Sequence, residues 1–289
     1  MSGQLKSTIR NGSKSFFLAS LFFSNEIRLA CWKLYQWCRH CDDKIDKGGT
    51  LEDITTLREQ TKRGILASED DEVFRHLGSL VREYKIPEKY PFELLEGLQK
   101  DASGERYHTI SELEVYSYHV AGVVGLMMSY IMGVKSREAS DQAVSMGNAM
   151  QLTNIARDVR EDYLLGRIYL PLNWLKENGV DTESMLEKKN LPALFEVVER
   201  LLAHADGLYQ KGYAGLKYLP LRAAFAVSIA GSIYSAIGKK VLRLGPKALE
   251  GRVSVGLPEK ILWIIHGLLR VVSQMPQRIS ERFFHVYNS

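Results

Sequence analysis

Two pairs of carboxylates at matched spacing are the side chains in this sequence best suited to chemistry. Asp42 and Asp46 are four residues apart, and so are Asp158 and Asp162. Because residues four apart lie on the same face of a helix, each pair would set two negative charges side by side at a cost in stability. A chain that repeats this arrangement is expected to hold divalent cations between its carboxylates.

Neutral and basic side chains continue both acidic faces at helical spacing. Mg²⁺ typically takes one or two carboxylates and completes its shell with waters and substrate phosphate oxygens. Arginines add charge-assisted hydrogen bonds to the same oxygens. Two such helices facing each other would clamp a diphosphate through bridging cations and make it a better leaving group. The residues that continue the faces are Trp32, Tyr35 and Arg39 before the first pair, and Gln151, Asn154 and Arg157 before the second.

Loss of a diphosphate from an allylic carbon chain leaves a carbocation. Such a cation survives only in a dry, apolar cavity whose aromatic faces stabilise it. The alternative for each pair is a solvated helix face without function, since a single D-x-x-x-D is a weak signal. The occurrence of two pairs with flanking Arg, Asn and Gln favours the metal-binding interpretation.

The elements that must position these residues are helices. Long stretches with helical periodicity separate the few prolines, and no stretch alternates convincingly as a strand does. The sequence therefore predicts one all-α domain over residues 1–289, with Asp42 in a helix over 25–46 and Asp158 in a helix over 137–165. The other expected helices lie over 51–66, 70–84, 91–103, 110–132, 192–214, 220–243 and 259–284.

Composition narrows the class of protein. The chain has 289 residues, 45% of them apolar and 25% charged, with a net charge of +4. These values are ordinary for a globular protein and give no reason to expect nucleic-acid binding. Cys31, Cys38 and Cys41 are odd in number and lack a second pair at zinc spacing, so we expect packing residues. With no apolar signal region and no run of 18 uncharged apolar residues, we expect a cytoplasmic protein without a spanning helix.

Two apolar features each have two interpretations. Gly122 and Gly125 fall inside the expected helix 110–132 and predict close approach of either a neighbouring helix or a ligand. The apolar run Ile261–Ile265 in the last helix suits either a core helix or an interfacial helix. The interfacial alternative would place the protein peripherally on the inner face of the membrane.

Six stretches, in family order along the chain, resemble the squalene/phytoene synthase family and most closely its bacterial phytoene-forming members. They run across most of the chain and together are highly specific. The resemblance implies the isoprenoid synthase fold, an all-α helical bundle around a central apolar cavity. The matching stretches are Gly12–Phe16, Tyr35–Asp43, Arg106–Tyr107, Tyr116–Gly125, Gln151–Asp158 and Arg167–Pro171.

The resemblance also implies an activity, the head-to-head condensation of two geranylgeranyl diphosphates. The implied product is 15-cis-phytoene, formed through prephytoene diphosphate in carotenoid biosynthesis. The implied cofactor is Mg²⁺ or Mn²⁺, with about two to three ions per site and no NADPH. The implied partners are prenyl diphosphate substrates and downstream carotenoid enzymes. Two alternatives stay open: a C30 synthase that makes squalene or dehydrosqualene from farnesyl diphosphate, and a catalytically silent assembly subunit.

Individual roles are carried over from the resemblance by position. The metal-bridging residues would be Asp42, Asp46, Asp158 and Asp162, with Asn154 as a further ligand, and Tyr116 would lie close to the reacting carbons. The residues that match family substrate contacts and cavity walls are Ser13, Lys14, Ser15, Tyr35, Arg39, Val120, Ala121, Gly125, Gln151, Asn154, Arg157, Arg167, Tyr234 and Arg252.

The length of the prenyl tail depends on what closes the cavity. Trp32 lies on the face of the first acidic pair, ~15 Å along the helix from Asp42 at about 1.5 Å per residue. We therefore hypothesise that Trp32 forms the floor of the cavity and favours a C15 tail over a C20 tail.

Overall fold

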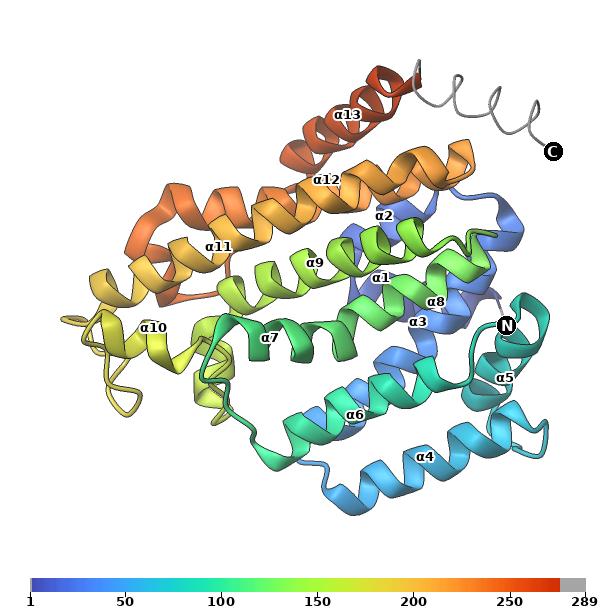
Figure 1. Ribbon diagram of the computed structural model, residues 1–289, viewed down its shortest axis with the longest axis horizontal. Coiled ribbons are helices and arrows are strands. Elements are labelled where there is room, and N and C mark those ends of the chain that lie inside the picture. The colour runs from blue at the N-terminus through green and yellow to red at the C-terminus, as the bar shows by residue number, and fades with distance from the viewer. Residues whose placement is uncertain (1, 276–289) are drawn as a thin grey trace.

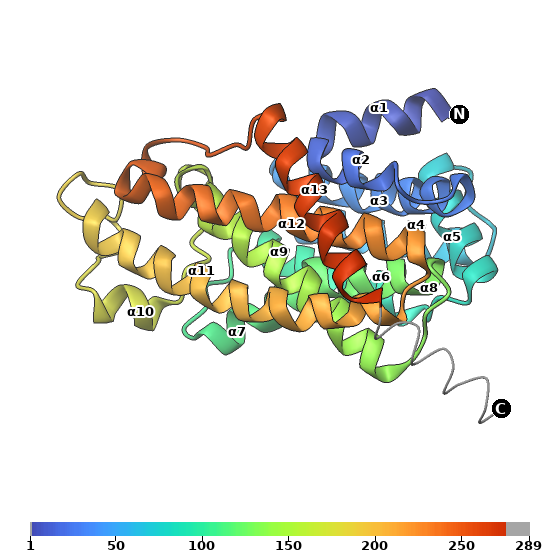
Figure 2. The same ribbon diagram turned by 90° about the horizontal axis from the view of Figure 1, so that it is seen from above.

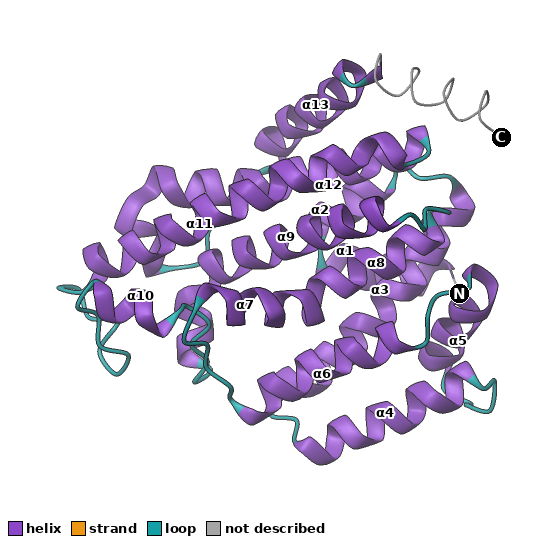
Figure 3. Cartoon of the chain, viewed as in Figure 1, coloured by secondary structure: helices purple, strands orange, loops and turns teal. Residues whose placement is uncertain are grey.

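The computed structural model describes residues 2–275, and this part of the chain forms helices joined by short loops, without a strand (Figures 1 and 3). The all-α expectation is therefore confirmed. In chain order the elements are α1 (Ser2–Gly12), α2 (Lys14–Ser20), α3 (Asn25–Asp46), α4 (Leu51–Ile65), α5 (Glu72–Tyr84), α6 (Lys89–Ser103), α7 (Ile110–Ser117), η1 (Tyr118–Gly122), α8 (Val123–Ile131), α9 (Arg137–Leu164), α10 (Leu172–Glu177), α11 (Leu191–Ala214), η2 (Gly215–Tyr218), α12 (Leu221–Leu244), η3 (Gly245–Glu250) and α13 (Leu257–Ser273).

The two helices that carry the acidic pairs begin and end close to where the sequence predicts. The side chain of Ser24 accepts a hydrogen bond from a backbone N–H in the first turn of α3, and Ser136 does the same for α9. The chain leaves α9 just before Gly166, whose positive φ of 77° ends the helix in the left-handed region. Local capping chemistry therefore fixes the acidic pairs at the last turns of α3 and α9.

Sequence periodicity missed three α-helices, α1, α2 and α10, and the 3₁₀ helices η2 and η3. α2 and α10 have only 7 and 6 residues. Such lengths are too short for a repeating apolar face to stand out. The expected last helix, over 259–284, begins at Leu257, and its predicted part beyond residue 275 lies outside the described residues.

The segment expected as one helix over 110–132 is interrupted by a π-helical turn, η1. The glycines of this segment lie against α9. A Cβ on Gly125 would come within 2.6 Å of the backbone oxygen of Ala143, and a Cβ on Gly147 would come within 2.5 Å of that of Ala121. Close helix packing therefore requires these glycines, and no larger side chain fits between the two backbones.

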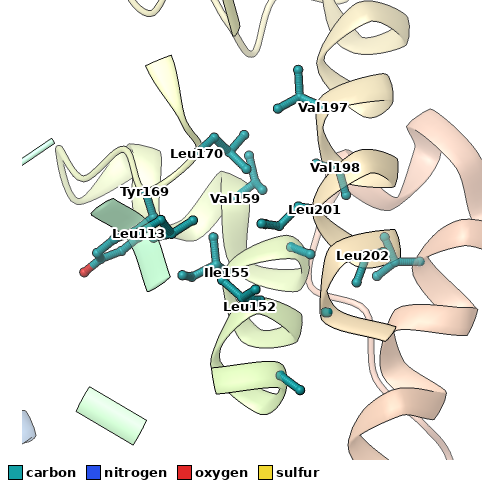
Figure 4. Packing of buried hydrophobic residues seen from close by; sticks show 14 of the residues in the cluster. Leu113, Leu152, Ile155, Val159, Tyr169, Leu170, Val197, Val198, Leu201 and Leu202 are labelled. Carbon is teal, nitrogen blue, oxygen red and sulfur yellow. The ribbon is translucent and has the colours of Figure 1, made fainter. Parts of the chain in front are cut away.

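Each acid-bearing helix is held by its own hydrophobic cluster. Leu152, Ile155 and Val159 on α9 face Val198 and Leu201 on α11 in the larger cluster (Figure 4). The second cluster gathers buried side chains of α3, α4, α5, α6 and α8. The region between these clusters holds the cavity described below.

One helix of the described residues is long and apolar enough to cross a membrane by length and composition alone. It runs over Leu221–Glu250, which is α12 with η3. However, 67% of its apolar window is buried inside the domain. α12 lies between α9, α11, α2 and α13 (Figures 1 and 2) and is a mostly buried helix of the fold.

Candidate active site

A cavity of about 890 Å³ lies between α3, α9 and the helices around them. Its lining follows α9 from Ala139 to Asp162, roughly 35 Å of helix at about 1.5 Å per residue. Carboxylates and arginines line one end, and small or apolar side chains line the other. All the candidate site residues, from Ser13 to Arg252, contribute to this lining. The residues proposed from the sequence therefore line a single cavity. Their position on its wall does not by itself assign a role to any of them.

The first acidic pair lies at the end of α3 and is surrounded by arginines. Arg39 bonds to Asp42 at 2.9 Å and also pairs with Asp43. Arg167, from the loop after α9, bonds to Asp46 at 2.5 Å. Burial, and then the negative charge of Asp46, raise the pKa of Asp42 to about 7. The arginines therefore only partly offset the repulsion between these carboxylates.

The second acidic pair lies where α9 is distorted. Asp158 has non-helical dihedral angles, φ −103° and ψ 15°, inside an otherwise continuous helix. Arg157 binds both carboxylate oxygens of Asp158, and Arg252 bonds to one of them at 3.1 Å. Burial, and then the charge of Asp158, raise the pKa of Asp162 to about 8. Asp158 is thus held by two arginines, whereas Asp162 forms no ion pair with another residue in the described range 2–275.

Arg167 brings the two acidic pairs together. Besides its ion pair with Asp46, its positive charge lowers the pKa of Asp162 on the other helix. The buried carboxylate of Asp101 acts on both sides, because its charge raises the pKa of Asp42 and of Asp162. The facing arrangement predicted from spacing alone is therefore present, with a basic and an acidic residue between the pairs.

The donor set at this end of the cavity fits a hard cation that also takes ligands from a substrate. Among residues 2–275, no three carboxyl, imidazole or thiol groups converge on one point as a closed metal site would require. Mg²⁺ and Mn²⁺ accept carboxylate and phosphate oxygens and retain waters, so paired carboxylates suffice as the protein's share. One oxygen of Glu161, which also lines the cavity, is buried without a hydrogen-bond partner. A site that is rich in carboxylate oxygens, and whose negative charge is only partly balanced by arginines, suits these ions.

The cysteines take no part in this donor set. Cys31 and Cys41 are buried, and all three thiols are free. Burial raises the pKa of Cys31 to about 12, which keeps it protonated at neutral pH. Cys38 packs against the second hydrophobic cluster, as expected, and it also lines the cavity.

The junction of α1 and α2 brings a polar segment to the cavity. The Ser13 hydroxyl caps α2 by accepting from the backbone N–H of Phe16, and it lies 3.2 Å from the Tyr234 hydroxyl on α12. A Cβ on Gly12 would come within 2.4 Å of the Tyr35 hydroxyl, so a larger residue there would have to displace the Tyr35 side chain. Lys14 and Ser15 follow on the same wall. This segment is therefore fixed to both α3 and α12.

Sequence reasoning missed Asp101, which organises a group of tyrosines. Its carboxylate accepts hydrogen bonds from the hydroxyl of Tyr116 at 2.9 Å and from that of Tyr169 at 2.7 Å. Burial raises the pKa of Asp101 to about 6, although these two hydrogen bonds act against the rise. A usable signal existed, because Asp101 continues the apolar stripe of Leu94 and Leu98 on its helix.

The hypothesis that Trp32 closes the cavity is wrong. Trp32 is absent from the described lining, and its indole N–H donates to the hydroxyl of Ser20 at 2.9 Å. It packs instead with Leu5 and Ile9 of α1, a helix that the sequence analysis did not predict. The apolar end of the cavity is lined by Met128, Met132, Ala139, Gln142, Ala143, Met146, Gly215 and Leu219.

Comparison with known proteins shows which family the chain belongs to. The chain matches the family model described as squalene/phytoene synthase over residues 9–259. It is 38% identical to a 15-cis-phytoene synthase of Enterobacter agglomerans, over 94% of this chain and 96% of that protein. It is also 38% identical to a 15-cis-phytoene synthase of Pantoea ananas, over 89% and 88% of the two chains. A crystal structure of a dehydrosqualene synthase with a ligand superposes with a TM-score of 0.87 at 28% identity, covering 94% of this chain and 96% of that one.

Proposed function

Because the chain belongs to the squalene/phytoene synthase family, we propose that it is a prenyltransferase that condenses two geranylgeranyl diphosphates head to head to 15-cis-phytoene. One observation carries the proposal: two acidic pairs, on α3 and α9, face a single cavity that continues away from them between small and apolar side chains. We further propose that residues 1–289 act as one catalytic domain in carotenoid biosynthesis.

The acidic end would hold the metal ions of the reaction. We assign Asp42 and Asp46 to one side of the site, and Asp158, Asp162 and Asn154 to the other. Bound Mg²⁺ or Mn²⁺, about two to three ions, would neutralise the diphosphate as it leaves with the electron pair of its C–O bond.

The chain's own cations would hold the diphosphate in place. Arg39, Arg157 and Arg167 lie on the cavity wall, each already paired with an aspartate. A guanidinium presents several donors at once, so it can keep its aspartate and still bind a phosphate oxygen. Ser13 and Lys14 would close over the diphosphate from the α1–α2 junction.

The expected reaction joins the two C1 carbons through one new carbon–carbon double bond and releases two diphosphates and two protons. One diphosphate leaves, the double bond of the second substrate attacks the resulting C1 cation, and proton loss closes the cyclopropane of prephytoene diphosphate. The second diphosphate then leaves, the skeleton rearranges, and a second proton loss gives phytoene. No reductant enters this balance, which is why we propose a reaction without NADPH.

Tyr116 is suited to orient groups near the cation and unsuited to remove a proton as a phenolate. Burial raises its pKa well above the ordinary value, and its hydroxyl donates to Asp101. We therefore propose that released diphosphate accepts the proton, while Tyr116 and Tyr169 present their ring faces to the cation.

A C30 product is the second candidate, favoured by the superposition on a dehydrosqualene synthase. The deciding experiment incubates the protein with Mg²⁺ and either farnesyl or geranylgeranyl diphosphate, with and without NADPH, and identifies products by mass. We expect phytoene from the C20 substrate, independent of NADPH. A C30 product formed in preference would favour the second candidate. No diphosphate release from either substrate would favour a silent assembly subunit.

Peripheral association with a membrane, and contact with downstream carotenoid enzymes, belong to the same proposal. A phytoene product is a hydrocarbon with no polar group, so it needs an apolar acceptor outside the cavity. For a cytoplasmic protein, the inner face of the cell membrane would supply this apolar acceptor.

A further inference from the structure

The segment from α7 to α8 lines the cavity with side chains that are four residues apart. They are Tyr116, Val120, Val124 and Met128. In a regular α-helix each step of four residues overshoots a full turn by about 40°, so Tyr116 and Met128 would lie roughly 120° apart. The π-helical turn η1 falls between them and fits one more residue into its turn than an α-helix does, which removes about 100° of this difference. η1 therefore keeps the four side chains on one face of the segment.

Two side chains donate hydrogen bonds to the last turn before η1. The backbone N–H of Tyr118 is shared between the carbonyls of Glu114 and Val115. The amide of Asn148, on α9, donates to the carbonyl of Glu114 at 3.4 Å. The Nδ1 of His119 donates to the carbonyl of Val115 at 2.8 Å. A π-helical turn moves its hydrogen bonds from the fourth residue to the fifth, which leaves nearby carbonyls short of backbone donors, and these two side chains supply the missing donors.

η1 packs tightly between α6 on one side and α9 on the other (Figure 1). On the α6 side, a Cβ on Gly97 would come within 2.6 Å of the Val120 side chain. On the α9 side, a Cβ on Gly122 would come within 2.7 Å of the Asn148 Oδ1. Gly122 therefore leaves the space that the amide of Asn148 occupies, and the amide lies directly against the backbone of η1.

Stability alone does not explain an asparagine at position 148. Asn148 is only 7% exposed, and its Oδ1 accepts no hydrogen bond from any residue between 2 and 275. A buried polar atom without a partner costs free energy, which a leucine of similar size would avoid. Without the amide, the carbonyl of Glu114 would still accept from the N–H of Tyr118. The value of the amide therefore lies in what it does to η1.

From these contacts we propose that Asn148 is a positioning residue. Its amide holds η1 in the π-helical form, and η1 keeps Tyr116 on the same face as the wall along which the prenyl tail lies. In a regular α-helix Tyr116 would turn by roughly 100° relative to Met128, so it could not both face that wall and donate to Asp101 as it does. Asn148 is absent from the cavity lining and acts through the backbone. This role rests on the proposed function, which supplies the tail and the cation.

The variant Asn148→Leu separates positioning from structural support, because it keeps the volume and removes the amide. We expect kcat for diphosphate release from geranylgeranyl diphosphate to fall about tenfold, since a small misplacement near the reacting carbons is costly. Tm should stay the same or rise, because the unpaired Oδ1 is gone. Hydrogen exchange of the Val123 N–H, which bonds to the carbonyl of Tyr118 across η1, should quicken on the order of tenfold. Calorimetry with Mg²⁺ and inorganic diphosphate should give an unchanged affinity, because the acidic end is untouched.

A second position and a matched control complete the test. His119→Phe removes the donor to the carbonyl of Val115 and should also lower kcat, whereas His119→Gln keeps a donor and should retain the activity. Thr153→Val is the control on α9, because the Thr153 hydroxyl is equally buried but lies 3.1 Å from the Tyr209 hydroxyl of α11. It should lower Tm, since it leaves Tyr209 without this partner, and should leave kcat and the exchange at Val123 unchanged.

Three outcomes would overturn the inference. They are an Asn148→Leu variant in which Val123 exchanges as slowly as in the wild type, one in which exchange quickens while kcat is unchanged, and one in which Tm falls together with kcat, as it would for a merely structural residue. A wild-type chain that releases no diphosphate from either prenyl substrate would count against the proposed function instead. The exchange at Val123 needs no substrate, so it would still decide whether Asn148 holds η1.

Discussion

The acidic faces of α3 and α9 carry the same D-x-x-x-D spacing, yet the structure treats them differently. α3 is regular through Asp42 and Asp46, whereas α9 is distorted at Asp158. Arg157 binds both oxygens of Asp158, while Arg39 divides its donors between Asp42 and Asp43. Equal spacing therefore gives Asp158 a two-point contact with one arginine, and gives Asp42 a single contact with an arginine that it shares with Asp43.

The two helices also differ below their acidic pairs. α9 lines the cavity over nearly its whole length, from Ala139 to Asp162. α3 lines it only from Tyr35 onward, because Trp32 turns into the packing of α1. The lesson is that α3 supplies mainly the acidic end, whereas α9 supplies both the acidic end and the wall along which a prenyl tail would lie.

The largest expected effect tests whether both acidic faces are required. Asp42→Asn and Asp158→Asn should each lower the rate of Mg²⁺-dependent diphosphate release by ~10³-fold, since a lost carboxylate removes several kcal/mol of charge stabilisation. Asp141→Asn is the control, because Asp141 lies on α9 but is exposed and absent from the cavity lining. A loss confined to one helix would show that the two faces are unequal in the chemistry as well as in geometry.

The next effect tests the difference in how the arginines hold their aspartates. Arg157→Lys removes a two-point contact that a lysine cannot reproduce, so we expect a loss on the order of 100-fold in kcat/KM. Arg39→Lys keeps a single charge contact at a more exposed position and should lose only about tenfold. Equal losses in steady-state assays of the two variants would contradict the distinction.

A smaller effect tests which helix determines the length of the tail. Ala143→Phe adds bulk to the α9 wall, ~22 Å along the helix from Asp158, and should lower kcat/KM for the C20 diphosphate on the order of tenfold relative to C15. Trp32→Phe should leave the ratio of the two substrates unchanged. If competition assays find that Trp32→Phe alters the ratio of kcat/KM for the C20 and C15 substrates, Trp32 does contact the prenyl tail.

The smallest effect concerns pH and the metal-free protein. The folded-state pKa values of Asp42 and Asp162, about 7 and about 8, lie above the ordinary 3.8. The native state therefore binds these protons more tightly, so their contribution to stability is complete below about pH 4 and is lost as the pH rises through 7 and 8. Water screens Asp42, whose side chain is 41% exposed, which reduces its share.

Thermal melting in the absence of divalent ions measures this effect. Added Mg²⁺ should raise Tm by more at pH 8.5 than at pH 6, because the ionised carboxylates bind the ion. The double variant Asp42→Asn/Asp162→Asn should show a flatter dependence of Tm on pH. A wild-type Tm that rises between pH 6 and pH 8.5 without metal would contradict the raised pKa values as the main cause.

Local sequence signals predicted a large part of this molecule. The helical periodicity and the family motifs were sufficient to locate α3, α9 and every residue proposed to line the site except Trp32. These sequence signals are local, because a helical face depends on residues within a few positions of each other. Asp101 was within reach by the same reasoning, as a carboxylate on an apolar stripe, and was overlooked.

The sequence by itself determined the fold class, the two acidic pairs and the chemistry that their spacing permits. Only the tertiary structure decided that Arg167 joins the two pairs, that Asp158 sits in a distorted turn, and that Trp32 leaves the cavity for α1. These facts depend on contacts between segments far apart in the chain, such as the 121 residues that separate Asp46 from Arg167. Helical periodicity reports which side of a helix is buried, but it carries no information about which neighbour covers it.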